Sequence, residues 1–230
     1  IKIHHTTGLA YLACGDEQGR KTQWFPPNDV LNYSYHPRET FYVYNTETDK
    51  LTPLTLKNFA DEEDFSLHGF GMYEDPAESE IAVDGLMFAN GINTNWDYSH
   101  IFVGAVGTGE LLVYERKPDN KLKLLEAVQV EYAIDNVSVD PVTGEIYLAV
   151  MDVFLHLNGI KDAKLAFSVL KVSNNTGENK FYGIKYEKKK IFEDDGTLFG
   201  AVSVAAGDSV RKVMLLGSFH TPGVIRCELN

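Results

Sequence analysis

The sequence has little cysteine, few basic residues and no long apolar run, and each scarcity excludes a class of protein. Two cysteines in 230 residues, Cys14 and Cys227, are too few for a disulfide framework. Because 33 acidic residues outnumber 21 lysines and arginines, the formal net charge is −12, which argues against nucleic acid as a partner. No apolar run approaches the roughly 18 residues of a membrane-spanning helix, so we expect no transmembrane segment.

Two common catalytic motifs are also lacking. Without a Gly-x-Ser-x-Gly sequence an α/β-hydrolase mechanism has no nucleophile motif, and no P-loop is present. Three Asn-x-Ser/Thr sequons, at Asn32, Asn136 and Asn174, permit glycosylation and favour a secreted or extracellular protein, although such triplets also arise by chance. Because Ile1 opens a β-like pattern with neither methionine nor signal sequence, we expect the true amino terminus to lie upstream.

Short apolar segments separated by turn sequences predict an all-β fold. The segments are rich in β-branched and aromatic residues, as strands are. They include 41–44, 101–106, 111–114, 146–150, 167–172 and 213–217. Turn sequences such as 117–120 and 140–144 stand between them. Only 160–166 has a helical pattern, and it is weak.

One pair of segments repeats along the chain. Asn136 follows Asn90 by 46 residues, and the strand-like segment at Ile146 follows the one at Ile101 by 45. A weaker third copy spans 200–217. A period of roughly 40 to 50 residues with about four strands in each unit is typical of β-propeller blades.

The repeat brings oxygen-bearing side chains to equivalent positions. In a propeller the innermost strands surround one channel, so Asn90 and the pair Asp135 and Asn136 are expected to face each other there. Amide and carboxylate oxygens are hard ligands, and Ca²⁺ accepts about six to eight of them. No cysteine or histidine cluster competes for a softer metal. The alternative is that these residues only form Asx turns at strand entrances.

The motifs closely resemble those of the paraoxonase/arylesterase family, in the family's order and from one end of the chain to the other. The segments that carry the resemblance are 7–11 (TGLAY), 67–70 (LHGF), 88–93 (FANGIN), 101–104 (IFVG), 113–115 (VYE), 134–141 (IDNVSVDP), 143–147 (TGEIY) and 227–229 (CEL). The resemblance implies a single domain over residues 1–230, a six-bladed β-propeller of which this chain covers only part.

The resemblance also implies two Ca²⁺ ions in the channel, one catalytic and one structural. Asn90, Asp135 and Asn136 match ligands of the catalytic ion, and the backbone carbonyl of Phe70 matches a ligand of the structural ion. The catalytic ion would polarise the carbonyl or phosphoryl oxygen of a lactone, an aryl ester or an organophosphate for attack by water. His68 matches a family histidine at the mouth of the site and is the candidate catalytic base.

On the same resemblance, Phe88 and Phe219 line an apolar pocket for a small lactone or ester, and no organic cofactor is expected. A gluconolactonase-like sugar lactonase is an alternative with the same fold and a divalent metal, although polar sugars suit this pocket less well. A non-catalytic propeller that presents its loops to a partner protein is a second alternative. Peripheral association with a membrane or lipid stays open.

The chain departs from the family pattern in two places. The family has a Glu ligand and a structural-site Asp just before the segment that matches 7–11, and the usual disulfide partner of Cys227 also lies upstream of Ile1. Between the motifs at His68 and Asn90 the family has about 90 residues by the blade period, whereas 21 intervene here. The absent stretch would carry another Asn ligand, its neighbouring Asp and a second histidine. We therefore expect a piece of a longer protein with a segment missing near 75–84; a naturally shortened, metal-free relative is the alternative.

Overall fold

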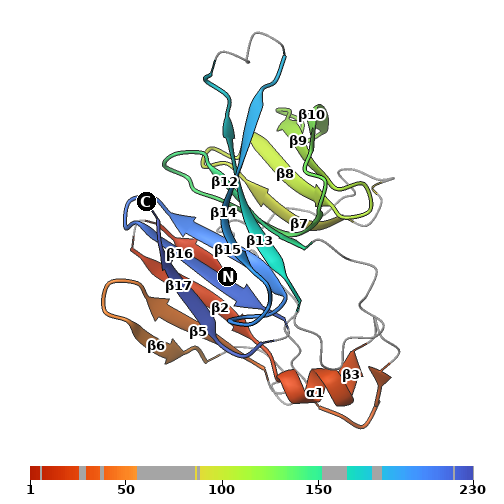
Figure 1. Cartoon of the computed structure of the whole chain (residues 1–230), viewed down its shortest axis with the longest axis vertical. Coiled ribbons are helices and arrows are strands. Elements are labelled where there is room, and N and C mark those ends of the chain that lie inside the picture. The colour runs from red at the N-terminus through yellow and green to blue at the C-terminus, as the bar shows by residue number, and fades with distance from the viewer. Residues whose placement is uncertain are drawn as a thin grey trace.

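The computed structural model has an all-β architecture, as the strand-like segments predicted (Figure 1). The structure describes residues 1–5, 7–25, 30–36, 39–55, 86, 89–151, 165–177, 183–219 and 221–229. The strands within these ranges are β1 (Lys2–His4), β2 (Leu9–Cys14), β3 (Trp24–Phe25), β4 (Val30–Leu31), β5 (Thr40–Asn45), β6 (Lys50–Pro53), β7 (Ala89–Thr94), β8 (His100–Ala105), β9 (Glu110–Arg116), β10 (Leu122–Gln129), β11 (Ala133–Val139), β12 (Ile146–Met151), β13 (Phe167–Asn174), β14 (Tyr186–Asp194), β15 (Val202–Asp208), β16 (Val213–Ser218) and β17 (Val224–Glu228).

Most of the strands form four antiparallel sheets that follow one another along the chain. Their strand orders are β1-β2-β5-β6, β10-β9-β8-β7, β11-β12-β13-β14 and β15-β16-β17, and β3 pairs with β4 in a separate ribbon. The first strand of each sheet lies at an edge, and these first strands contact one another in the series β7, β11, β15 and β1. Sheets arranged with their first strands side by side are the blades of a propeller.

Three of the inner strands carry an irregularity at the same place in their ladders. The register shifts by one residue within 89–92 of β7, within 134–137 of β11 and within 202–204 of β15. A β-bulge of this kind adds a residue to one strand, bends it and re-aims the side chains there. The three copies of the sequence repeat, including the weaker third copy, therefore each contain a β-bulge.

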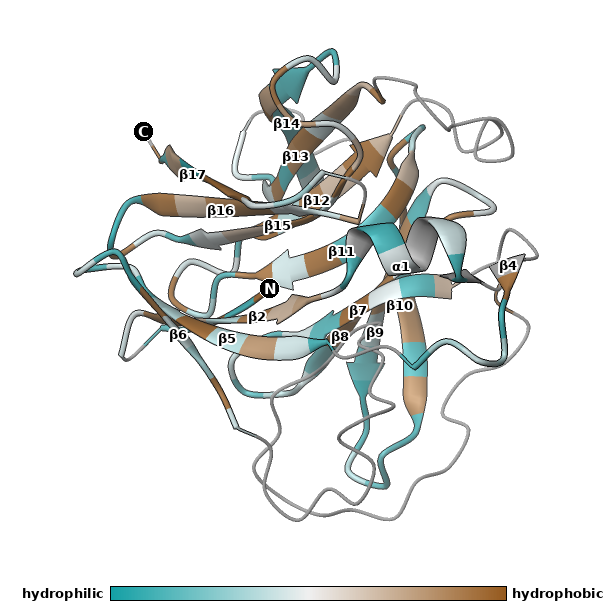
Figure 2. Ribbon diagram, turned by 90° about the horizontal axis from the view of Figure 1, so that it is seen from below, coloured by the Kyte–Doolittle hydropathy of each residue, from teal (hydrophilic) through white to brown (hydrophobic). Residues whose placement is uncertain are grey.

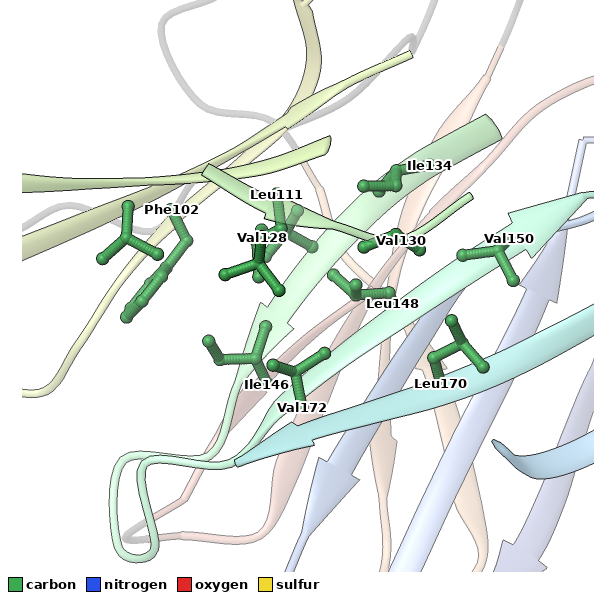
Figure 3. Packing of buried hydrophobic residues seen from close by; sticks show 12 residues of the cluster. Phe102, Leu111, Val128, Val130, Ile134, Ile146, Leu148, Val150, Leu170 and Val172 are labelled. Atoms are coloured by element: carbon green, nitrogen blue, oxygen red, sulfur yellow. The ribbon is translucent and has the colours of Figure 1, made fainter. Parts of the chain in front are cut away.

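Apolar side chains between neighbouring sheets hold the blades together. Figure 2 shows hydrophobic residues along the strands and hydrophilic ones in the connecting turns. The cluster between β8–β10 and β11–β13 includes Leu111, Ile134 and Leu148, none of which has exposed surface (Figure 3). Similar clusters join β12–β13 to β15–β16, and β1–β2 to β15–β16. Because burying one such side chain is worth about 1.5 to 3 kcal/mol, these faces fix the inner strands relative to one another.

One helix was not expected from the sequence. Helix α1 (Glu17–Thr22) begins after Asp16, whose carboxylate accepts a hydrogen bond from the backbone N–H of Gly19 at 3.0 Å. With six residues it is too short to show helical periodicity, and the capping Asp is its one clear sequence signal. Of the weak helical pattern at 160–166, residues 160–164 lie outside the described residues and the last two belong to no helix.

The two cysteines are free thiols. Cys14 on β2 and Cys227 on β17 are each partly buried, and no disulfide joins them. The disulfide that the resemblance implies for Cys227 involves another partner and stays a prediction. The segment near 75–84 lies outside those residues as well. No helix in the described part of the chain has the length and hydropathy that crossing a membrane requires.

Candidate functional site

The bulges of β7 and β11 bring three of the predicted metal ligands together. The Nδ2 of Asn90 donates a hydrogen bond to the Oδ1 of Asp135 at 3.2 Å, and the Nδ2 of Asn136 donates to the same oxygen at 2.9 Å. Asn90 is exposed, whereas Asp135 and Asn136 are partly buried. Two inner strands from different sheets thus contribute one carboxylate and two carboxamides to a single cluster, which we call the oxygen cluster; the role of these residues as ligands stays a prediction.

A third inner strand fixes the orientation of Asn136. Its Nδ2 also donates to the backbone carbonyl of Ser203, in the bulge of β15, at 2.9 Å. A carboxamide has two N–H bonds, and here both are used. The Oδ1 of Asn136 is therefore the part of the side chain that is left to bind a ligand.

The backbones of β7 and β11 approach each other closely beside the cluster. A Cβ atom on Gly91 would lie 2.5 Å from the backbone nitrogen of Val137 and 2.6 Å from both the carbonyl oxygen of Asp135 and the Cα of Asn136. The Nδ2 of Asn93 crosses the same gap and donates to the carbonyl of Val137 at 3.2 Å. Sequence reasoning singled out the motif that contains Gly91 and Asn93 but gave these two residues and Ser203 no role, because distances between strands cannot be read from residue types along the chain.

The surroundings of Asp135 disfavour its charged form. Burial raises the pKa of its carboxyl group to about 7, against the opposing hydrogen bond from Asn90. Among the described residues its Oδ2 has no hydrogen-bond partner, and no cationic side chain pairs with it. A partly buried carboxylate in this condition gains free energy by taking up a proton or a cation.

The donors of the oxygen cluster suit a hard divalent cation. They comprise the carboxylate of Asp135 and the amide oxygens of Asn90 and Asn136, and such oxygens are preferred by Ca²⁺. In the described part of the chain no group of three or more His, Cys, Asp or Glu side chains comes together as a metal site. The cluster therefore fits an oxygen-bound ion in chemistry while supplying only part of the roughly six to eight ligands that Ca²⁺ takes.

The other predicted site residues are placed less fully. His68, Phe70 and Phe88 lie outside the described residues. Phe219 directly follows β16 and is 40% exposed. Its neighbour Ser218 pairs with Val202, so Phe219 lies at the same end of its sheet as the bulge of β15.

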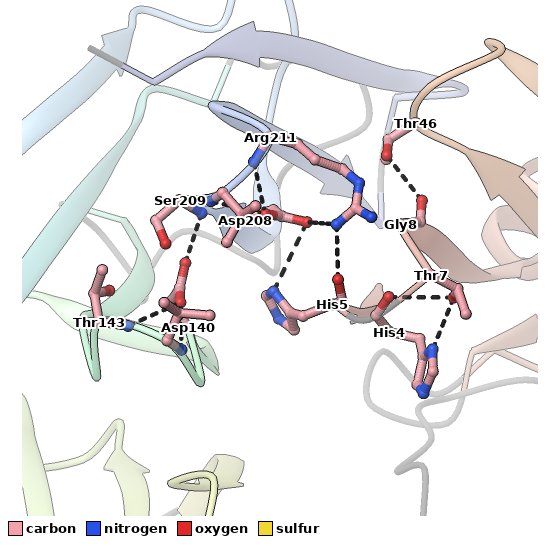
Figure 4. Close-up of polar contacts among 12 residues, drawn as sticks. His4, His5, Thr7, Gly8, Thr46, Asp140, Thr143, Asp208, Ser209 and Arg211 are labelled. Atoms are coloured by element: carbon pink, nitrogen blue, oxygen red, sulfur yellow. Dashed lines mark hydrogen bonds and ion pairs between the residues drawn. The ribbon is translucent and has the colours of Figure 1, made fainter.

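A second polar cluster, which the sequence did not reveal, lies at the opposite ends of the inner strands (Figure 4). Asp140, which follows β11, is fully buried. Its Oδ1 accepts hydrogen bonds from the backbone N–H groups of Val142 at 2.8 Å and Thr143 at 3.1 Å, and its Oδ2 accepts one from Ser209 at 2.6 Å. Burial alone would raise the pKa of Asp140, but its bonds with Ser209, Val142 and Thr143 outweigh this effect and lower it.

Asp208 has the same role at the end of β15. It is also fully buried, and its Oδ1 accepts from the backbone N–H groups of Val210 and Arg211 at 3.0 Å. The Nη1 of Arg211 donates to the Oδ2 of Asp208 at 3.1 Å and to the backbone carbonyl of His5 at 2.7 Å (Figure 4). Its Nε donates to Glu47 at 3.1 Å. Arg211 thereby joins the last sheet to the hairpins of the first.

His5 completes this second cluster. The Nδ1 of His5 is buried, has no hydrogen-bond partner among the described residues and lies 3.8 Å from the Oδ2 of Asp208. Burial lowers the pKa of His5, whereas the nearby charges of Asp140 and Asp208 act in the opposite direction. The signal that was available is the repeat itself, which puts an Asx residue at or just after the end of β7, β11 and β15, namely Asn95, Asp140 and Asp208.

Comparison with known proteins identifies sequence relatives over most of the chain. The family model described as Arylesterase matches residues 42–229. Serum paraoxonase/arylesterase 1 of Homo sapiens is 28% identical over 166 residues, which cover 69% of this chain and 42% of that protein. Serum paraoxonase/arylesterase 2 of Rattus norvegicus is 32% identical over 164 residues, with the same two shares. The chain therefore spans less than half the length of these relatives.

Solved structures add little to this result. An oligogalacturonate lyase from Vibrio parahaemolyticus superposes with a TM-score of 0.38 and 13% identity, over 77% of this chain and 39% of that chain. A likeness of this size does not bear on the site, so the sequence relatives carry the assignment.

Proposed function

Because the chain belongs to the arylesterase family, we propose that it carries part of the active site of a Ca²⁺-dependent hydrolase of lactones and aryl esters. The observation that carries the proposal is the oxygen cluster, in which a carboxylate that lacks a cation and two carboxamides converge from different sheets. When bound, the ion would polarise the carbonyl or phosphoryl oxygen of the substrate. Organophosphates would be accepted on the same principle.

The residues of the cluster have separate tasks in this proposal. Asp135 supplies the negative charge that favours a cation over neutral ligands, and Asn90 and Asn136 supply amide oxygens. The Ser203 carbonyl holds the Asn136 carboxamide by its nitrogen, which restricts rotation of that side chain before a ligand arrives. Preorganisation of this kind reduces the free energy that would be spent on ordering the site during binding.

His68 and three phenylalanines have further roles in the same proposal. His68 would take a proton from the attacking water, and its ordinary pKa near ~6.5 suits that task. The backbone carbonyl of Phe70 would bind a second, structural Ca²⁺, and Phe88 and Phe219 would line the substrate pocket. The other ligands of the ion would come from residues outside the oxygen cluster.

We also propose that the protein is secreted and glycosylated and that it associates peripherally with lipid. Asn136 uses both of its amide hydrogens within the oxygen cluster, so glycosylation of a secreted protein would fall on Asn32 or Asn174. Both of these residues are exposed.

The test compares Asp135→Ala with Asp119→Ala, which removes an exposed Asp from the turn between β9 and β10. Phenyl acetate and a δ-lactone serve as substrates, with calcium titrated against EDTA. We expect Asp135→Ala to lose activity by about a hundredfold or more, since a charged ligand is removed, and Asp119→Ala to retain it. Full activity in Asp135→Ala would remove Asp135 from the site. Stability that does not respond to EDTA, together with no turnover by the unmutated protein, would favour the non-catalytic propeller.

A further inference from the structure

Gly91 lies where two blades come closest beside the oxygen cluster. The three atoms that a Cβ there would meet, at 2.5 to 2.6 Å, all belong to the backbone of β11. Contacts of a Cβ below 3.0 Å essentially do not occur, and backbone atoms cannot rotate out of the way as a side chain can. Any other residue at position 91 would therefore have to push β7 away from β11.

The requirement for glycine comes from space and not from backbone conformation. Gly91 is not among the glycines with positive φ, so an L-residue would be compatible with its backbone angles. The corresponding place in the next bulge is occupied by Asn136, which carries a full side chain and uses it to reach Ser203. The bulge itself thus accepts a side chain, and the short distance between β7 and β11 is what forbids one.

That short distance is also what joins Asn90 to the cluster. The bond from Asn90 to Asp135 is 3.2 Å long, at the upper end of the usual range of about 2.7 to 3.2 Å. Separation of the strands by a few tenths of an ångström would break it, whereas the bond from Asn136 to Asp135 lies within β11 and would persist. The bond from Asn93 to Val137 crosses the same gap and would lengthen with it.

We infer that Gly91 is a positioning residue of the oxygen cluster: its missing side chain allows β7 to lie against the β11 bulge, so that Asn90 can share a ligand with Asp135 and Asn136. The inference rests on the proposed function for the identity of that ligand, a divalent cation. The spacing of β7 and β11 beside Gly91 is a property of the protein without any ligand.

The test compares Gly91→Ala with Gly104→Ala. Gly104 lies on β8 of the same blade, and a Cβ there would meet the Cγ2 of Ile134 at 2.8 Å. Both substitutions therefore crowd the interface between the same two sheets, but only the first crowds the backbone beside the cluster. Calorimetric titration with CaCl₂ should show affinity at least tenfold weaker for Gly91→Ala and within about twofold of wild type for Gly104→Ala.

A second readout requires no metal. In EDTA, the side-chain NH₂ resonances of Asn90 and Asn136 report their hydrogen bonds. We expect Gly91→Ala to shift the Asn90 signal while that of Asn136 stays, and Gly104→Ala to leave both in place. Equal calcium affinity and equal amide spectra in the two variants would overturn the inference. A wild-type protein that binds no calcium would defeat the proposed function instead, and the amide spectra would still decide the role of Gly91.

Asn93→Ala keeps the experiment decisive if Gly91→Ala does not fold. It introduces no clash and removes the bond that holds β7 to Val137. The Asn90 signal should then move in the same direction by a smaller amount. An unmoved Asn90 signal in a folded Asn93→Ala protein would count against the claim that the spacing of β7 and β11 positions Asn90.

Discussion

Strand β11 has a carboxylate near each end, and the two are bonded differently. Asp140 is fully buried, and three backbone N–H groups share its two oxygens. Asp135 is partly buried, and two side-chain amides converge on one of its oxygens. The pKa of Asp140 is lowered and that of Asp135 is raised to about 7.

The difference separates an acid that stabilises the fold from one that is available to a ligand. Backbone donors at a turn are fixed by the fold, so Asp140 is stabilised as an anion without a bound ligand. Asp135 depends on amides that can also turn their oxygens to a cation. Residue type does not distinguish the two, whereas the number and kind of their hydrogen-bond donors do.

The largest effect is expected in the pH dependence of the calcium-free protein. The pKa of Asp135 is about 7 in the folded state and about 3.9 in an unfolded chain, so between these values the folded state keeps a proton that the unfolded state has released. The free energy of unfolding should therefore fall as pH rises from about 4 to about 7, by at most about 4 kcal/mol. Urea unfolding of wild type and Asp135→Asn in EDTA measures this, because the variant lacks the titrating group.

Saturating calcium provides the control for that experiment. At pH 7 it should make the wild type more stable than Asp135→Asn, since the carboxylate then faces a cation. Parallel pH curves for the two proteins in EDTA would show that Asp135 is as well solvated as an ordinary surface acid.

A smaller loss of stability is expected when Asp140, whose two oxygens both accept hydrogen bonds, is replaced. Asp140→Ala leaves three backbone N–H groups without their acceptor, and about 1 kcal/mol for each gives a loss near 3 kcal/mol in the free energy of unfolding. The same change at exposed Asp119 should stay within about 0.5 kcal/mol. Denaturant unfolding in EDTA at pH 7 measures both; a loss below about 1 kcal/mol at Asp140 would mean that water replaces its bonds.

Arg211 gives the next effect in size. Arg211→Ala removes the cation from the fully buried carboxylate of Asp208 and the donor from the carbonyl of His5, with an expected loss of about 2 kcal/mol, as for a hydrogen bond to a charged group. Arg211→Lys should recover only part of this, because an ammonium group does not reproduce the fork of a guanidinium. Full recovery in the Lys variant, read from the unfolding midpoint, would show that charge alone matters.

The smallest effect should come from His5. Its pKa is lowered in the folded protein, so the unfolded state takes up a proton first and stability is lost as pH falls below about 6.5. His5→Gln should weaken this dependence by less than any of the preceding changes, and His4→Gln controls for loss of an imidazole at the same turn. Thermal melts between pH 7 and pH 5 measure it; an unchanged slope in His5→Gln would remove His5 from the pH response.

The features that could be predicted from the sequence depend on side-chain type and on regular spacing along the chain. Alternating strands, the blade repeat and the convergence expected for Asn90, Asp135 and Asn136 all follow from residues that face the same way once per blade. The predicted roles of these residues, and those of His68, Phe70, Phe88 and Phe219, stay predictions.

What escaped prediction depends on the backbone in three dimensions. The acceptor on Ser203 is a carbonyl that every residue has, and the close approach at Gly91 is a distance between sheets. The bonding of Asp140 likewise comes partly from Ser209, which lies 69 positions away on another hairpin. Helix α1 was missed because six residues give no period to detect.

The bond between Arg211 and the carbonyl of His5 spans 206 positions of the chain. During synthesis, the apolar face of the first sheet that packs on β15 and β16 has no cover until the last sheet has been made. Contacts so distant in sequence form late and slowly, because the entropic cost of closing a long loop must be met before the contacts stabilise the chain. The apolar face of the first sheet therefore stays exposed in a growing chain until β15 and β16 can pack on it.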